Sequence, residues 1–327
     1  MCVGKDKRGK SSLLGNKQSY IANFNCTFGK ENHPMLDYFF EIILPAFSKE
    51  EDQKKASKKN DADFFFRNVK LTNVKGEFVL AGLIVKSTTL EVKSRIIDGE
   101  LVKTNEVYPS DPYSYFLINL KNHRMVLVKN QKGSPTLKNF SVTAREKIKT
   151  FIREENKVKE EKLPNVHLNV VAIPFKGAIE EELKKVKQIR NVILRFYPLN
   201  GDIIDNETVD YLTESLEKLG CNTGNITYNT PTNKDNVASI IKDTKGLMKP
   251  TIRVQFKNGT SGTLKDDSFT EVMSIPLDEE ESFNQNIDEI TGKVINKPEF
   301  NETSEENRSI YDRMYTKLEN AYNKLFK

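Results

Sequence analysis

Hydrophobic residues gather in short runs that predict strands, and the most apolar runs lie near the middle of the chain. Residues 113–120 (YSYFLINL) and 125–128 (MVLV) flank a polar break at 121–124, a pattern that predicts a β-hairpin. β-branched and aromatic residues fall on both side-chain faces of these two runs, which is typical of strands covered on two sides. We therefore expect this hairpin in the centre of a sheet that ends at the Gly-Ser-Pro sequence 133–135.

Further apolar runs predict an antiparallel sheet around this hairpin. The dipeptide Asp98-Gly99 readily takes the positive φ angles of a type I′ turn, so the segments beside it are predicted to form a second hairpin. An amphipathic helix is predicted from Ala144 to Lys159. The additional strands are predicted at 20–28, 64–69, 77–85, 88–97 and 100–107.

The pattern changes after residue 163, where strands alternate with helices of about ten residues. This alternation predicts a small inserted α/β domain of split-βαβ, ferredoxin-like character at 164–245. The fold class that we predict is α+β, with a mainly antiparallel sheet domain, this inserted domain and a C-terminal helix. The sheet domain is built from 17–163 and 246–327, and 1–16 form a flexible arm.

The C-terminal third is predicted to contain a hairpin, a linker and a helix. Two strands between 250 and 277 are expected to return to the first sheet. Residues 278–302 are predicted to be an acidic linker, and 303–326 a helix. The helix either docks onto the chain's own core or forms a dimer seam, because its apolar residues recur at intervals of three and four. These residues are Tyr311, Met314, Leu318, Ala321 and Leu325.

Composition indicates a cytoplasmic protein with a heavily charged surface. Hydrophobic residues make up 37% and charged residues 30% of the chain. We find no run of roughly 18 apolar residues, as a membrane helix requires. The first residues have no apolar core or cleavage site of a signal peptide. The three cysteines, Cys2, Cys26 and Cys221, are isolated and odd in number, which argues against a disulfide framework and a structural zinc site.

The charge is unevenly distributed, and the basic part favours a polyanionic partner. Residues 64–150 hold 15 basic and 7 acidic residues, whereas 278–306 hold 2 basic and 10 acidic ones. Lysine and arginine side chains on strands and turns neutralise phosphates without reading bases, so the DNA binding that we predict is weakly specific. The alternative is a charged surface that only keeps the protein in solution. The predicted DNA-binding residues are Arg67, Lys70, Lys75, Lys121, Arg124, Lys129, Lys132 and Lys138.

Motifs of catalysis are largely absent from the sequence. It contains no GxxxxGK[ST] loop, no GxGxxG after a strand and no GxSxG, and its three histidines are far apart without ligand spacing. We therefore expect no cofactor and no metal site. One enzymatic alternative remains, because Glu91 and Lys93 form an apolar-Glu-x-Lys sequence such as Mg²⁺-dependent PD-(D/E)xK nucleases use. Similar Glu-x-Lys sequences elsewhere in the chain favour chance.

The order of these segments resembles the RexA family, the phage-exclusion proteins of lambda-like prophages. The resemblance rests on the central strands (SYFLINLKNHRMVLVKN), the SPTLKNF segment that follows, the PTIRVQFKNGTSGTL hairpin and a closing helix with YDRM. It implies a homodimer that binds DNA with little sequence preference and acts with a membrane-protein partner. It also implies a globular domain made from both chain ends and a mobile inserted domain.

We therefore predict a non-enzymatic, DNA-binding antiphage sensor or effector. Three other functions remain open: a PD-(D/E)xK-like defence nuclease, a protein-interaction module that works through the last helix, and a phage-encoded inhibitor.

Overall fold

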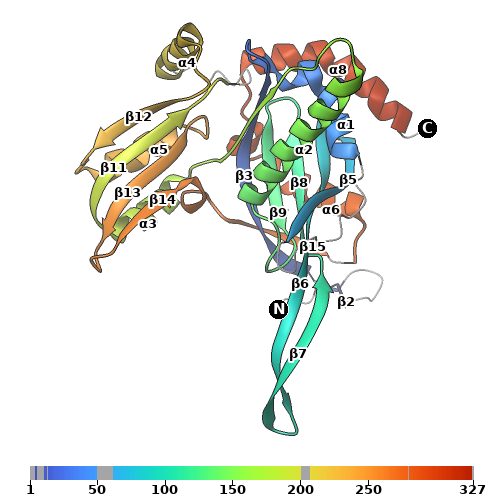
Figure 1. The fold of residues 1–327 in the computed structure, drawn as a ribbon, viewed down its shortest axis with the longest axis vertical. Coiled ribbons are helices and arrows are strands. Elements are labelled where there is room, and N and C mark those ends of the chain that lie inside the picture. The colour runs from blue at the N-terminus through green and yellow to red at the C-terminus, as the bar shows by residue number, and fades with distance from the viewer. Residues whose placement is uncertain are drawn as a thin grey trace.

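A nine-stranded and a four-stranded antiparallel sheet, with helices on their faces, make up most of the protein (Figure 1). The computed structural model describes residues 4–5, 11–12, 14–49, 62–199, 207–278 and 280–325. The predicted α+β class is confirmed. Along this described part of the chain, every helix is too short or too polar to span a bilayer.

The larger sheet has the strand order β10-β3-β9-β8-β6-β5, and β15, β4 and β7 pair with strands of this row. The long strand β3 pairs with β15 through its first half and with β10 through its second half. The strands are β3 (Leu14–Phe28), β4 (His33–Pro34), β5 (Asp63–Val74), β6 (Glu77–Ile97), β7 (Glu100–Ser110), β8 (Tyr113–Asn119), β9 (Arg124–Lys129), β10 (Val166–Ala172) and β15 (Met273–Asp278).

The predicted hairpin β8–β9 lies between β3 and β6, so its central position is confirmed. Because side chains alternate along a strand, Phe116 and Leu127 enter one core, whereas Leu117 and Val126 enter the core on the other face. Both cores are covered by helices, which explains why the hairpin is apolar on two sides. The first core is covered by α1 (Leu44–Ser48), α2 (Leu137–Val158) and α8 (Glu305–Leu325), and the second by α6 (Phe283–Val294) and α7 (Pro298–Asn301).

Phe116 lies at the centre of the first core, in a cluster of aromatic rings. Its ring centroid is 5.4 Å from that of Phe66 and 5.1 Å from that of Phe140. Gly82 is directly opposite Phe116 on β6. A Cβ atom at Gly82 would lie 2.7 Å from the Phe116 ring, so this close approach requires glycine.

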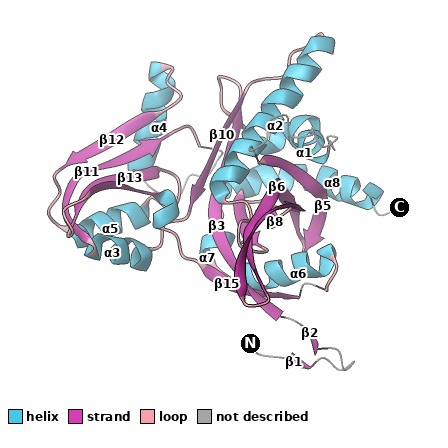
Figure 2. Cartoon of the chain, turned by 60° about the horizontal axis from the view of Figure 1, so that its bottom comes forward, coloured by secondary structure: helices cyan, strands magenta, loops and turns pink. Residues whose placement is uncertain are grey.

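The smaller sheet has the order β12-β11-β13-β14, and its strand pairs are all antiparallel. Helices α3 (Lys176–Lys184) and α5 (Lys234–Asp243) pack together on one side of it, as Figure 2 shows. Helix α4 (Glu207–Leu219) precedes the edge strand β12. The strands are β11 (Val186–Phe196), β12 (Gly224–Asn229), β13 (Lys249–Phe256) and β14 (Ser261–Lys265).

The boundaries predicted at 164 and 245 both differ from the structure. Strand β10, expected in the inserted domain, pairs with β3 of the larger sheet. The hairpin β13–β14, expected to return to the larger sheet, instead pairs with β11. The smaller unit therefore contains 176–265, and its strand order departs from the expected ferredoxin-like arrangement. The prediction was correct for β15, which does return to the larger sheet.

The predicted acidic linker 278–302 is wrong, because most of it is helical and packed. Helix α6 buries Ile287, Ile290 and Val294, and Phe300 of α7 is also buried. The acidic side chains of this segment concealed an apolar stripe at intervals of three and four residues. Ser282 caps α6 by accepting a hydrogen bond from the backbone N–H of Gln285.

Strand β6 continues past the larger sheet and forms with β7 a two-stranded ribbon that projects from the body (Figure 1). The predicted turn is confirmed, since Asp98 and Gly99 have φ angles of 51° and 88°. In the predicted arm 1–16, β1 (Gly4–Lys5) pairs with β2 (Ser11–Ser12), and β3 already begins at Leu14. The other residues of the arm lie outside the described ones.

Candidate nucleic-acid interface

One face of the smaller sheet is packed against helices, and the other is open. Val192, Leu194, Ile252 and Val254 point into the helix-covered core, where each is at most 3% exposed. Because neighbouring residues of a strand point to opposite faces, the side chains between them are directed away from the helices. Arg253, between Ile252 and Val254, is exposed on this second face.

Five cationic side chains gather on this second face, which we call the open face. Arg195 is opposite Lys249 on the adjacent strand, and Lys265 is opposite Thr251. Arg190 lies at a register shift of β11, and its Nη2 atom donates to Ser261 Oγ at 3.1 Å. All five cations are exposed to solvent. The open face is defined by Arg190, Arg195, Lys249, Arg253 and Lys265.

The four strands contain no acidic residue, although they contain six basic ones. The acidic residues that the structure describes in this unit lie instead on helices, for example Glu180, Glu181 and Glu182 on α3. The other side chains directed to this face are amides, hydroxyls and the apolar Ile193. The charge of the unit is therefore segregated, with the cations on the sheet.

The cross-strand pair Arg195 and Lys249 brings two like charges together. Directly opposite residues on antiparallel strands have Cβ atoms about 5 Å apart, and like charges at that separation destabilise the pair. Lys249 also contacts Asp266, with 3.5 Å between Nζ and Oδ2, at the margin of the sheet. An external polyanion would relieve the repulsion, because phosphates would lie between the cations.

The cations predicted in the larger unit do not form one comparable surface, and three of them make contacts within the chain. Lys121 pairs with Glu77 at 2.7 Å. Arg124 is only 3% exposed and donates from Nη1 to the carbonyl oxygen of Lys245 at 3.1 Å. Lys70 donates to the side chain of Asn284 and lies over the ring of Phe283.

The other five predicted cations are distributed over different parts of the larger unit. Arg67 lies over the Phe65 ring, with its guanidinium carbon 4.6 Å from the ring centroid. Lys75 lies in the turn between β5 and β6, whereas Lys129 is the last residue of β9 and Lys132 follows that strand. Lys138 is exposed in the first turn of α2. The structure therefore does not bring the eight residues together.

The nuclease candidates Glu91 and Lys93 lie on the projecting ribbon. Their side chains are 55% and 84% exposed, with 3.8 Å between Oε2 and Nζ. Such nucleases need a second acid, and Glu77, the acid that begins the same strand, instead pairs with Lys121. The described residues contain no group of three His, Cys, Asp or Glu side chains able to hold a metal ion. The arrangement needed for two-acid Mg²⁺ binding is thus not assembled around Glu91.

The last helix docks onto the chain's own core. Tyr311, Met314 and Leu318 are at most 7% exposed, and Ala321 packs against the same core. The hydroxyl oxygen of Tyr311 accepts a hydrogen bond from the backbone N–H of Phe78 at 2.8 Å. The docking interpretation is confirmed, and the apolar stripe of α8 is not available as a dimer seam. The side chain of Leu325 lies outside the described part.

The turn between β8 and β9 joins the two units. Asn122 donates from Nδ2 to the carbonyl oxygen of Phe300 at 2.8 Å, and Arg124 reaches Lys245 of the smaller unit. His123, which lies between Asn122 and Arg124 in this turn, has a φ angle of 57° and is fully buried. Burial, together with the nearby Arg124 charge, lowers the pKa of His123 to about 3.

We expect His123 to make the protein less stable in mild acid. The pKa of His123 is lower in the folded state than the ordinary value of 6.5, so the unfolded chain binds the extra proton between these values. Stability contributed by the neutral ring is present above pH 6.5 and is lost as the pH falls toward 3. His123→Gln should therefore reduce the loss of unfolding free energy between pH 7 and pH 4 by about 3 kcal/mol, measured by urea denaturation.

A substitution that removes no titratable group provides the control for this measurement. Val142→Ala, at a 50% exposed position on α2, should leave the pH dependence of the unfolding free energy as it is in the wild type. An equal change in both variants would show that burial of His123 is not the cause.

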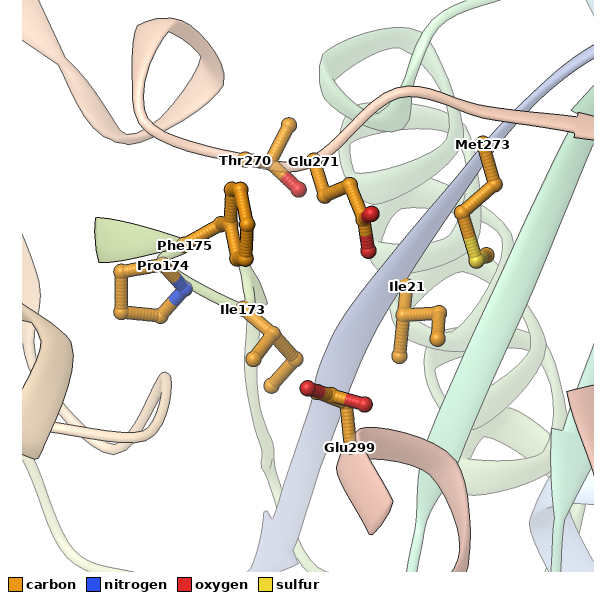
Figure 3. Close-up of a pocket in the computed structure, with 8 residues that line it drawn as sticks. All are labelled: Ile21, Ile173, Pro174, Phe175, Thr270, Glu271, Met273 and Glu299. Atoms are coloured by element: carbon orange, nitrogen blue, oxygen red, sulfur yellow. The ribbon is translucent and has the colours of Figure 1, made fainter. Parts of the chain in front are cut away.

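A hollow at the junction of the two units is too small for a substrate. It lies between Ile21, Phe175 and Met273, with the carboxylates of Glu271 and Glu299 on opposite sides (Figure 3). Its cavity volume of about 20 Å³ accommodates about one water molecule. This hollow at the junction is therefore excluded as a substrate site.

Sequence reasoning missed the open face, although a signal for it exists in the sequence. The strands β11, β13 and β14 read VKQIRNVILRF, KPTIRVQF and SGTLK, with alternating cations and no acid. The net charge of a long segment does not reveal this pattern, because acidic residues on the helices between the strands cancel the cations of the strands. Pairing of β11 with β13 is what places Arg195 beside Lys249.

Comparison with known proteins gives no assignment: no family model, curated protein or solved structure matches the chain. The resemblance to the RexA family stays a prediction. The functional argument therefore depends on the arrangement of this chain's own residues.

Proposed function

We propose that this protein binds DNA through the open face of its smaller sheet, with little sequence specificity. The observation that carries the proposal is the acid-free sheet, on which Arg195 and Lys249 lie opposite each other. Cations on a rigid sheet contact phosphates at low entropic cost, and binding releases the counterions of the DNA. Phosphate contacts orient a protein on DNA but do not read sequence.

The proposed biological role is phage exclusion, and it rests on the resemblance to the RexA family. In this role the protein is a cytoplasmic, non-enzymatic sensor or effector that acts as a homodimer with a membrane-protein partner. DNA binding through a polar, basic surface suits a sensor that must recognise DNA of any sequence. The function thus requires affinity for phosphates and no catalytic centre.

A salt titration of binding to unrelated duplex DNAs tests the proposal. We expect similar affinities for all duplexes, a steep loss of affinity with salt, and intact DNA after incubation with Mg²⁺. Fluorescence anisotropy measures the affinity, and a gel measures cleavage. Absence of binding at low salt would contradict the proposal, and Mg²⁺-dependent cleavage would favour the nuclease alternative.

A further inference from the structure

The ribbon of residues 88–110 exposes apolar side chains along its length. Leu90 is 58% exposed, and Ile96 and Leu101 near the tip are 76% and 74% exposed. An isolated two-stranded ribbon is only marginally stable in water, since it buries little apolar surface. Exposed apolar residues grouped on such an element mark an interaction surface.

Among the described residues, one edge of β6 has no partner strand in this ribbon. Val85 is opposite Tyr113 of β8 and Thr88 is opposite Ser110 of β7, so both partners follow the same edge. The other edge pairs with β5 as far as Ser87. From Thr88 to Ile97, no strand within the described residues pairs with that edge. A free strand edge presents N–H and C=O groups that pair with another strand.

We propose that two copies of this chain associate by pairing the free edge of β6 antiparallel with itself, about Lys93. In this register Leu90 lies opposite the partner's Ile96, and Glu91 lies opposite the partner's Arg95. Twofold symmetry forms each pair twice, because an isologous interface uses the same surface on both subunits. The most exposed apolar residues of β6 are then buried against each other.

The charges of the ribbon favour a second copy over an unrelated strand. Residues 86–110 contain four basic and four acidic residues, so the ribbons carry no net charge, and the like-charge contact of this register is confined to Lys93 at the axis. A partner strand must offer a base opposite Glu91 and an apolar residue opposite Leu90, and β6 itself offers both in the antiparallel direction. Lys93 meets its own counterpart at the axis, where the partner's Glu91 is its diagonal neighbour.

Arg95 is able to take part although it already has partners. Its Nη2 atom contacts Glu106 at 2.8 Å and the Tyr108 hydroxyl at 2.9 Å. A guanidinium group has five N–H donors, so others serve the partner's Glu91. The ribbon lies apart from the smaller sheet in Figure 1, so this association leaves the open face accessible.

Two single charge substitutions and their combination test the register. Leu90→Glu and Ile96→Lys should each weaken dimerisation roughly tenfold, because each places a charge against an apolar residue in two symmetric pairs. The combined variant should recover dimerisation, because the two new charges lie opposite each other across the interface. The two positions are roughly 20 Å apart within one strand, so no pair forms inside a single chain.

Sedimentation equilibrium of the full chain measures the association. We expect wild type to reach twice the chain mass of 37.5 kDa as concentration rises. Val158→Lys, at an 81% exposed position on α2, is the control and should dimerise like the wild type. A wild type that stays monomeric, single variants that dimerise normally, or a combined variant as weak as the single ones would each overturn the proposal.

Discussion

Replacing Arg195 and Arg253 together by glutamate is expected to lower DNA affinity on the order of 1000-fold at low salt. A unit charge held near a polyanionic surface contributes roughly 1 kcal/mol, and the two reversals change four unit charges. Both side chains are exposed on the open face, so the substitutions remove phosphate contacts without opening a cavity. Fluorescence anisotropy with a duplex of arbitrary sequence measures the change.

A matched pair of substitutions in the larger unit separates the contribution of Arg195 and Arg253 from the effect of total charge. Lys75→Glu with Lys132→Glu changes the total charge by the same amount at exposed positions away from the smaller sheet. The DNA affinity of this double variant should fall far less than that of the variant with Arg195 and Arg253 replaced. An equal or larger loss would place the interface in the larger unit, where the sequence alone predicted it.

Phe116→Ala is expected to have the largest effect on stability. Phe116 is fully buried, and the rings of Phe66 and Phe140 pack against it. Truncating a buried phenylalanine removes apolar contacts and leaves a cavity, which together cost about 3–5 kcal/mol. Gly82 stays opposite the vacated ring position and offers no side chain to fill it. Urea denaturation followed by circular dichroism measures the unfolding free energy.

Tyr211→Ala on α4 serves as the control for the truncation, because the Tyr211 side chain is 70% exposed. Its unfolding free energy should stay within about 0.5 kcal/mol of the wild type. A loss below about 1 kcal/mol for Phe116→Ala would mean that the aromatic cluster is not the centre of the cooperative core.

Local patterns in the sequence predicted local structure well. The apolar runs around 121–124 predicted β8 and β9, and Asp98-Gly99 predicted the ribbon turn, since both depend on neighbouring residues. The three-and-four spacing from Tyr311 to Leu318 predicted the helix that docks on the core. Such patterns predict structure only within one strand or helix, because they depend on residues that are close together in the sequence.

Long-range strand pairing was not predictable in the same way. β10 and β13 have apolar patterns that fit either sheet, and the partner of a strand is decided by packing across the whole fold. The acidic residues around Ile287 likewise hide an amphipathic helix, because they dominate the composition of a segment whose apolar residues recur at helical intervals. The open face depended on these pairings, so a sum of charges along the sequence could not locate it.

The most direct test of the central proposal is the salt dependence of DNA binding in wild type and in the Arg195→Gln, Arg253→Gln double variant. If both arginines contact phosphates, the slope of log affinity against log salt should be shallower in the variant by about 2, since each contact releases about one counterion. The predicted result is a weaker, less salt-dependent complex. Identical slopes in the two proteins would contradict the assignment of the open face as the DNA-binding surface.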